Sequence, residues 1–120
     1  MYGLPEDTDL SAFVGCEVEL VSIGLYQVNL NFDGLRKIGI TIESDYAVSG
    51  PGAAQNRYSA APEGAAGLVG LLGSRVTDVQ VADHGTTTVH FVGGAAIMIY
   101  DSEEHYESYQ IYIGDRLIVV

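Results

Sequence analysis

Apolar and polar residues alternate along several short segments of this chain. In residues 26–33, Val28, Leu30 and Phe32 share one face, and polar residues occupy the other. A period of two is typical of an antiparallel strand with one buried face. The other segments that we expect to form strands are residues 18–23, 38–42, 76–81, 86–92, 95–100, 109–113 and 117–120.

The two halves of the chain carry the same pattern of apolar positions. The matched pairs are Leu10 with Leu68, Phe13 with Leu71, Gly15 with Gly73, Val18 with Val76, Val21 with Val79, Ile23 with Val81, Phe32 with Phe91, Ile38 with Ile97, Ile40 with Ile99 and Tyr46 with Tyr109. One extra residue near His84 and four further residues before Tyr109 interrupt the match. We therefore predict an internal duplication, with repeats at about 8–48 and 66–120 and a Gly/Ala/Pro-rich connector at 49–65.

The start of each repeat predicts a short helix, because apolar residues at i, i+3 and i+4 are followed by a glycine. The predicted class is α+β, dominated by β structure. Two pseudo-symmetric units, each a helix plus antiparallel strands, form one sheet-based domain over residues 1–120 with two short helices. The sheet is expected to be curled or split into a small two-layer sandwich. The predicted core consists of Leu30, Phe32, Ile38, Ile40, Phe91, Ile97, Ile99 and Ile111.

The charge of the chain narrows the classes of partner. Sixteen acidic residues face five basic ones, for a formal net charge of −11. Binding to a nucleic-acid backbone or to an anionic membrane needs a Lys/Arg surface, so both are excluded as partners. The N-terminus shows no signal-peptide pattern, no apolar run reaches the roughly 20 residues of a membrane span, and Cys16 has no partner for a disulfide. These features predict a cytoplasmic protein.

An acidic, tyrosine-bearing stretch coincides with the four extra residues of the second repeat. The candidate partner-binding residues in and beside it are Asp101, Glu103, Glu104, Tyr106, Glu107 and Tyr109. Tyrosines beside carboxylates are the mixture that binds Arg/Lys-rich partners. A solvated loop is the alternative for such a run of charges, and Tyr109 also matches Tyr46, which favours a structural role for that residue.

Catalytic and metal-binding patterns are weak in this sequence. No zinc spacing, EF-hand pattern, nucleophile elbow or phosphate loop is present, so we expect no cofactor, no bound metal and no enzyme activity. The alternative is a small-molecule- or metal-binding domain that uses residues 101–107, with weak hydrolytic activity.

Several segments of the second repeat carry a resemblance to a known family. They are Leu71-Leu72-Gly73, Val76-Thr77, Phe91-Val92-Gly93-Gly94 and, most specifically, Tyr106-Glu107-Ser108-Tyr109-Gln110-Ile111. On these motifs the chain resembles a family of small bacterial proteins of uncharacterised function with a C-terminal YESYQI-type motif. In its small size, acidity and β-rich pattern it is also similar to immunity proteins of toxin systems. The expected function is a non-enzymatic module that binds a basic protein such as a toxin, and a homodimer stays open.

Overall fold

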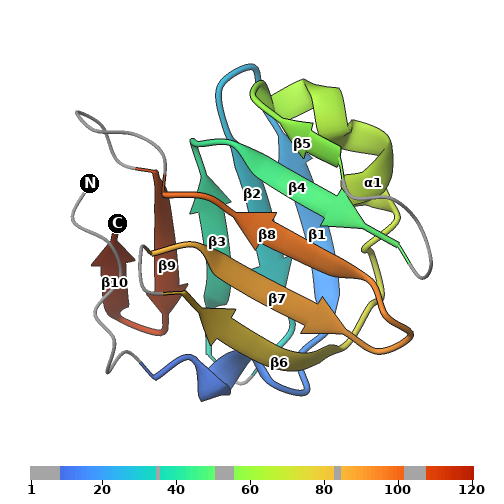
Figure 1. The fold of residues 1–120 in the computed structure, drawn as a ribbon. Helices are drawn as coiled ribbons and strands as arrows, with labels where there is room; N and C mark the ends of the chain where they lie inside the picture. Colours follow the sequence, from blue (N-terminus) through green and yellow to red (C-terminus); the bar gives the residue numbers. More distant parts are fainter. Residues whose placement is uncertain (1–8, 35, 51–55, 83–84, 102–107) are drawn as a thin grey trace.

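The chain folds into two five-stranded antiparallel sheets that pack face to face (Figure 1). The computed structural model describes residues 9–34, 36–50, 56–82, 85–101 and 108–120. The strands are β1 (Val18–Ile23), β2 (Val28–Phe32), β3 (Ile38–Ile42), β4 (Tyr46–Ser49), β5 (Asn56–Tyr58), β6 (Val76–Val81), β7 (Thr87–Phe91), β8 (Ala96–Ile99), β9 (Tyr109–Ile113) and β10 (Arg116–Val119). The helical elements are the 3-10 helices η1 (Ser11–Phe13) and η2 (Ala61–Gly64) and the α-helix α1 (Ala65–Val69).

The core lies between the inner faces of the two sheets. The first sheet has the strand order β1-β2-β3-β9-β10, and the second has the order β5-β4-β8-β7-β6. The alternation in β2 buries Val28, Leu30 and Phe32 and leaves the two asparagines between them half-buried. All eight residues of the predicted core are buried, which confirms that prediction.

The prediction of an α+β fold with two short helices is wrong. Strands make up 50% of the chain and helical residues only 12%, so the protein is β-dominated, with two antiparallel sheets, one short helix and 3-10 turns. The first predicted helix is the single turn η1. Asp9 accepts a hydrogen bond from the Ser11 N–H at its start, and Gly15 reverses the chain with a φ of 89° at its end. The segment is too short for an α-helix, and its bonds run from residue i to i−3, as from Phe13 N–H to the Leu10 carbonyl.

The two sheets correspond strand by strand. Each half of the chain contributes three consecutive antiparallel strands to one sheet, β1-β2-β3 or β6-β7-β8. The next strand then crosses to the other half's sheet, so that β4 pairs with β8 and β9 pairs with β3. Each crossing strand is followed by an edge strand, β5 or β10. The order of corresponding strands is therefore the same in the two sheets, and the internal duplication stays a prediction.

The structure shifts the correspondence between β3 and β8 by two residues. The match along the sequence paired Ile38 with Ile97. Ile40 lies opposite Leu30, and Ile97 lies opposite Val89, so that Ile40 rather than Ile38 corresponds to Ile97. The connection between β2 and β3 is therefore longer than the one between β7 and β8, where Gly93 and Gly94 turn the chain with positive φ. With this register Tyr46, opposite Ile99, still corresponds to Tyr109, opposite Ile42.

Removing the Phe91 side chain tests which face of β7 is buried. Phe91 is 3% exposed, and its replacement in Phe91→Ala leaves a cavity between the sheets. We expect the free energy of unfolding to fall by about 3–5 kcal/mol, measured by chemical denaturation. Val92→Ala is the control, because the neighbouring Val92 is 61% exposed and its truncation should change stability little. Equal losses for the two variants would contradict the assignment of the buried face.

Candidate functional site

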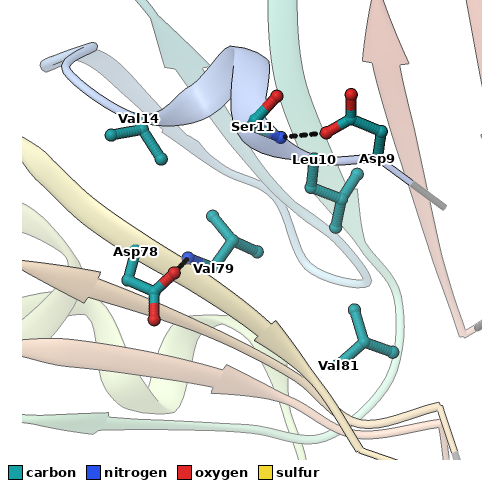
Figure 2. A pocket seen from close by; sticks show the side chains of 7 residues that line it. All are labelled: Asp9, Leu10, Ser11, Val14, Asp78, Val79 and Val81. Carbon is teal, nitrogen blue, oxygen red and sulfur yellow. Dashed lines mark hydrogen bonds between the residues drawn. The ribbon is translucent and has the colours of Figure 1, made fainter. Parts of the chain in front are cut away.

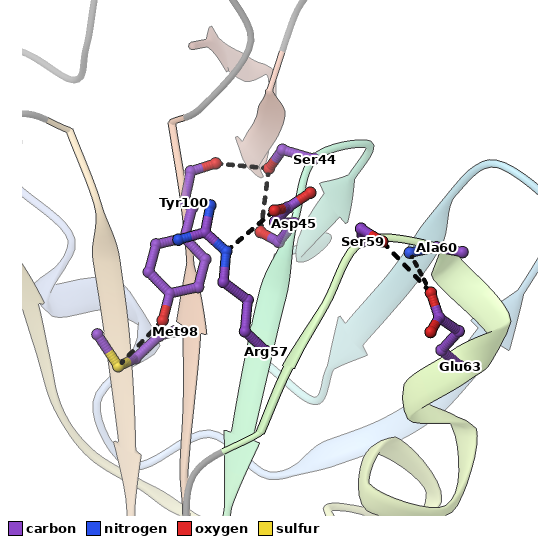
Figure 3. A network of polar contacts seen from close by, with 8 residues as sticks. All are labelled: Ser44, Asp45, Arg57, Ser59, Ala60, Glu63, Met98 and Tyr100. Carbon is purple, nitrogen blue, oxygen red and sulfur yellow. Dashed lines mark hydrogen bonds and ion pairs between the residues drawn. The ribbon is translucent and has the colours of Figure 1, made fainter.

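Tyr100, which follows β8 on the second sheet, is held in place from three sides. Its N–H donates to the Asp45 carbonyl at 3.1 Å, and its own carbonyl accepts from the Ser44 hydroxyl at 2.6 Å. The Arg57 guanidinium lies over its ring, with 3.9 Å between the guanidinium carbon and the ring centroid (Figure 3). Strand order explains these contacts, because β4 lies between β8 and β5.

The Arg57 side chain is itself fixed by a carboxylate. Its Nε donates to Asp45 Oδ2 at 2.9 Å. The Arg57 side chain is 51% exposed and that of Asp45 26% exposed, so this ion pair adds little to stability. Its effect is orientation: it directs the guanidinium plane onto the Tyr100 ring, where a cation–π contact is favourable.

Beside Tyr100 the outer face of the second sheet is hollowed. The hollow has a volume of about 590 Å³ and is lined by Gln80, Val81, Ala82, Thr86, Thr88, Met98 and Tyr100. Figure 3 shows Met98 next to the Tyr100 hydroxyl, and the oxygen lies 4.0 Å from the Met98 sulfur. We call this depression, with Arg57 and Asp45 at its margin, the Tyr100 surface. Tyrosine, methionine and arginine are the residue types enriched at the centres of protein interfaces.

No group of three or more His, Cys, Asp or Glu side chains able to hold a metal occurs among the residues that the structure describes. His90 Nε2 is 3.0 Å from the Gln80 Oε1 atom. The Cys16 thiol donates to the Ala12 carbonyl, and its pKa is raised, chiefly by burial and then by Asp33, which disfavours the thiolate nucleophile.

The predicted site residues fall into three places. Asp101 is half-buried next to Tyr100 and accepts a hydrogen bond from the Ser108 hydroxyl at 2.9 Å. This bond joins the two ends of the acidic stretch. The predicted residues within that stretch, Glu103, Glu104, Tyr106 and Glu107, lie outside the described residues.

The assignment of Tyr109 to a partner-binding surface is corrected by the structure. Tyr109 is 0% exposed, because it opens β9 on the same face as Ile111 and Ile113. Its hydroxyl donates to the Gly85 carbonyl at 2.5 Å and lies 2.8 Å from the Thr87 hydroxyl. Tyr46 has a similar role in the other half: it is 1% exposed, and its hydroxyl donates to the Ala61 carbonyl. Both tyrosines anchor the corner at which a crossing strand begins.

A second hollow lies between η1 and β6 (Figure 2). It measures about 350 Å³, and its lining consists of Asp9, Leu10, Ser11, Val14, Asp78, Val79 and Val81. The two carboxylates flank a valine wall, and each accepts a backbone N–H, from Ser11 and from Val79. The Ser11 hydrogen bonds lower the pKa of Asp9, so that it is charged at neutral pH. We call this hollow the η1–β6 groove.

The described residues form a small acidic β-sandwich with two open hollows on its surface. The chain belongs to a family of unknown function, DUF6188, whose model matches residues 10–120. A family without a known function is what the resemblance implied; its bacterial origin and the likeness to immunity proteins remain predictions. No curated protein and no solved structure matches the chain. Among the described residues, none of the helical segments has the length and apolar character of a membrane span.

The corner role of Tyr109 predicts a stability loss in Tyr109→Phe. Without the hydroxyl, the buried Thr87 hydroxyl and the Gly85 carbonyl each lose a hydrogen-bond partner, so we expect a loss of about 1–3 kcal/mol. Tyr46→Phe should show a comparable loss, since the Tyr46 hydroxyl binds the Ala61 carbonyl and the Gly64 N–H. Tyr26→Phe is the control, because Tyr26 is 81% exposed. Chemical denaturation measures all three, and a loss in Tyr109→Phe no larger than in Tyr26→Phe would rule out the corner role.

The raised pKa of Tyr109 predicts that the free energy of unfolding falls at alkaline pH. Burial raises the pKa of Tyr109 to about 12; the hydrogen bond with Thr87 opposes this rise, and the Asp101 charge adds to it. An exposed tyrosine in the unfolded chain has a pKa of about 10. The folded state therefore holds the proton longer, and this stabilisation is complete below about pH 10 and is lost as the pH rises towards 12. In Tyr109→Phe, the free energy of unfolding should fall less steeply across that window than in the wild type.

Proposed function

We propose that the chain is a non-enzymatic binding module that caps a basic protein, in the manner of an immunity or inhibitor protein acting on a toxin. Its contact surface is the Tyr100 surface together with the acidic stretch that begins at Asp101. The observation that carries this proposal is the fixed Tyr100 ring, which stands between the Arg57 guanidinium and the Met98 hollow.

A fixed aromatic ring favours binding because little conformational freedom remains to be lost. The Tyr100 N–H donates to the Asp45 carbonyl, the Tyr100 carbonyl accepts from the Ser44 hydroxyl, and the Arg57 guanidinium covers the ring before any partner arrives. Side chains that are already immobilised avoid an ordering cost of about 0.5–1.5 kcal/mol each on association. Tyr100 therefore suits the role of a binding hot spot at the centre of an interface.

The charge of the chain supports a basic partner. A net charge of −11 attracts a cationic protein over a distance of about a Debye length, close to 8 Å at physiological salt. Carboxylates at the margin of an interface mostly raise the association rate, whereas buried anchors slow dissociation. In this proposal Glu103 and Glu104 raise the association rate of the partner, and Tyr100 slows its dissociation.

The test compares variants at the margin and at the centre of the surface. The partner is the basic protein that co-purifies with the wild type, and surface plasmon resonance measures its rates. Glu103→Gln with Glu104→Gln should lower the association rate several-fold, and Tyr100→Ala should raise the dissociation rate, with melting temperatures little changed. Binding of the wild type should weaken as salt rises.

A matched control removes the same charge elsewhere. Glu19→Gln with Asp115→Asn neutralises two exposed carboxylates on the first sheet and in the β9–β10 turn. Its association rate should fall less than that of the Glu103/Glu104 variant, since the lost charges lie outside the contact. Equal effects from the two double variants, or unchanged dissociation in Tyr100→Ala, would refute this placement of the interface.

A further inference from the structure

Two of the few arginines in this acidic chain meet at one end of the first sheet. Arg36 lies two residues before Ile38, the first residue of β3, and Arg116 is the first residue of β10. β9 lies between these strands, and its last residue, Ile113, pairs with Ile38 on one side and with Arg116 on the other. The register therefore brings both arginines to the end of the sheet where β3 begins, β9 ends and β10 begins (Figure 1).

Contacts of the β9–β10 turn hold the Arg36 side chain near β10. The Gly114 N–H donates to the Lys37 carbonyl at 2.6 Å, which ties the turn to the segment before β3. The stem of Arg36 lies over Gly114, because a Cβ added there would be 3.3 Å from Arg36 Cδ. Gly114 also has a φ of 61°, a conformation that favours glycine. A glycine at this position thus allows both the tight turn and the close approach of the arginine.

Both arginines line a third hollow, which lies beside η1. It has a volume of about 350 Å³, and its lining consists of Asp9, Ser11, Ala12, Arg36, Ile113 and Arg116. We call it the two-arginine hollow. Elsewhere in the described part of the chain, Arg57 and Arg75 each form an ion pair with a carboxylate. Among the same residues, Arg36 and Arg116 form none, so their guanidinium N–H groups can serve a ligand.

The carboxylate in the lining does not neutralise the two guanidinium groups. Asp9 accepts a hydrogen bond from the Ser11 N–H at 2.9 Å. The hydrogen bonds with Ser11 are the main cause of the lowered pKa of Asp9, and the Arg116 charge lowers it further. One negative charge faces two positive ones in the lining, and Asp115, which precedes Arg116 in the chain, is not part of it. The hollow therefore favours an anion, although the chain as a whole has a net charge of −11.

The shape and the apolar part of the lining favour an organic acid over an inorganic anion. A guanidinium group presents its N–H donors as a planar fork that matches a carboxylate. Ala12 and Ile113 provide an apolar wall beside the arginines. A neighbouring hollow of about 220 Å³ shares Arg36 and Ala12 with the first and is otherwise lined by Cys16, Gly34 and Ile38. A carbon chain can cover these apolar atoms, whereas a phosphate ion cannot.

We propose that the two-arginine hollow binds a small organic carboxylate, with its oxygens on Arg36 and Arg116 and its carbon chain against Ala12 and Ile113. Short-range hydrogen bonds supply the affinity, since the net charge of the chain repels an anion at longer range. This site is independent of the proposed function, because the Tyr100 surface lies on the second sheet and its partner is a cationic protein.

An NMR titration of the full chain with butyrate tests the ligand class. At constant ionic strength, butyrate should cause saturable shifts of the backbone amide signals of Ser11, Ala12 and Arg116. Inorganic phosphate should bind more weakly, and butylamine, which has the same carbon chain and the opposite charge, should not shift these signals. No saturable shift with butyrate, or tighter binding of phosphate, would overturn the proposal. The titration contains no protein partner, so its outcome does not depend on the proposed function.

Variants that remove two positive charges in different places test the position of the site. Arg36→Gln with Arg116→Gln should raise the dissociation constant of butyrate by about tenfold or more, since charge-assisted hydrogen bonds are lost. Arg57→Gln with Arg75→Gln is the matched control: it changes the net charge equally, and the ion pairs that it breaks are exposed and add little to stability. Its dissociation constant should stay close to that of the wild type. Equal dissociation constants in the two double variants would refute the assigned position.

The carboxylate beside the arginines gives a test with the opposite sign. Asp9→Asn removes a negative charge from the lining and keeps a side-chain oxygen that can accept from the Ser11 N–H. Butyrate should therefore bind more tightly to this variant than to the wild type. Weaker binding in Asp9→Asn would show that the hollow does not select its ligand by negative charge and would overturn the proposal.

Discussion

The two halves of this protein are joined at a short backbone bridge, and the arrangement of both sheets depends on it. Glu17 pairs with Arg75 in an isolated antiparallel bridge, and these two residues occupy the same place in their halves. Four backbone hydrogen bonds surround them in two matching pairs: Gly15 to Val76 with Gly73 to Val18, and Val18 to Ser74 with Val76 to Cys16. A residue that pairs with its own counterpart lies next to an approximate two-fold axis. The bridge thus fixes how one sheet lies over the other.

The backbone of this bridge matters more than its charges. Arg75 donates to the Glu17 carboxylate at 2.5 Å and to the Gly15 carbonyl at 2.8 Å. The Arg75 side chain is 55% exposed, however, and an exposed ion pair contributes only about 0–1 kcal/mol. Each backbone bond contributes roughly 0.5–1.5 kcal/mol, so four of them outweigh the ion pair. From the bridge, β1 and β6 begin the two sheets, and the exchange of β4 and β9 then makes the halves inseparable.

The alternation of apolar residues was sufficient to predict the strands and the buried face, because burial on one side of a sheet imposes a period of two. It also contained the information that Tyr109 points inwards, since Tyr109, Ile111 and Ile113 share a face; the charges around Tyr109 led to the surface assignment instead. The i, i+3, i+4 spacing did not separate an α-helix from the 3-10 turn η1, since both place these residues on one side. Nothing local linked Arg57 to Tyr100. Their contact depends on β4 lying between β5 and β8, and strand order is not written in either segment.

The correspondence between the halves separates what the fold needs from what it merely permits. Paired positions that keep their character, such as the corner tyrosines Tyr46 and Tyr109, serve the common framework. Positions that differ are free of that requirement. In the other half Glu43 corresponds to Tyr100, because each residue directly follows its strand. Val119 corresponds to Arg57, because Val119 lies opposite Gln110 and Arg57 lies opposite Ala47. The stacked pair of Tyr100 and Arg57 therefore has no counterpart in the other half. The other half has the same strand order without such a pair, so the common framework does not require it. The proposed contact with a basic protein gives the pair a role that the framework does not.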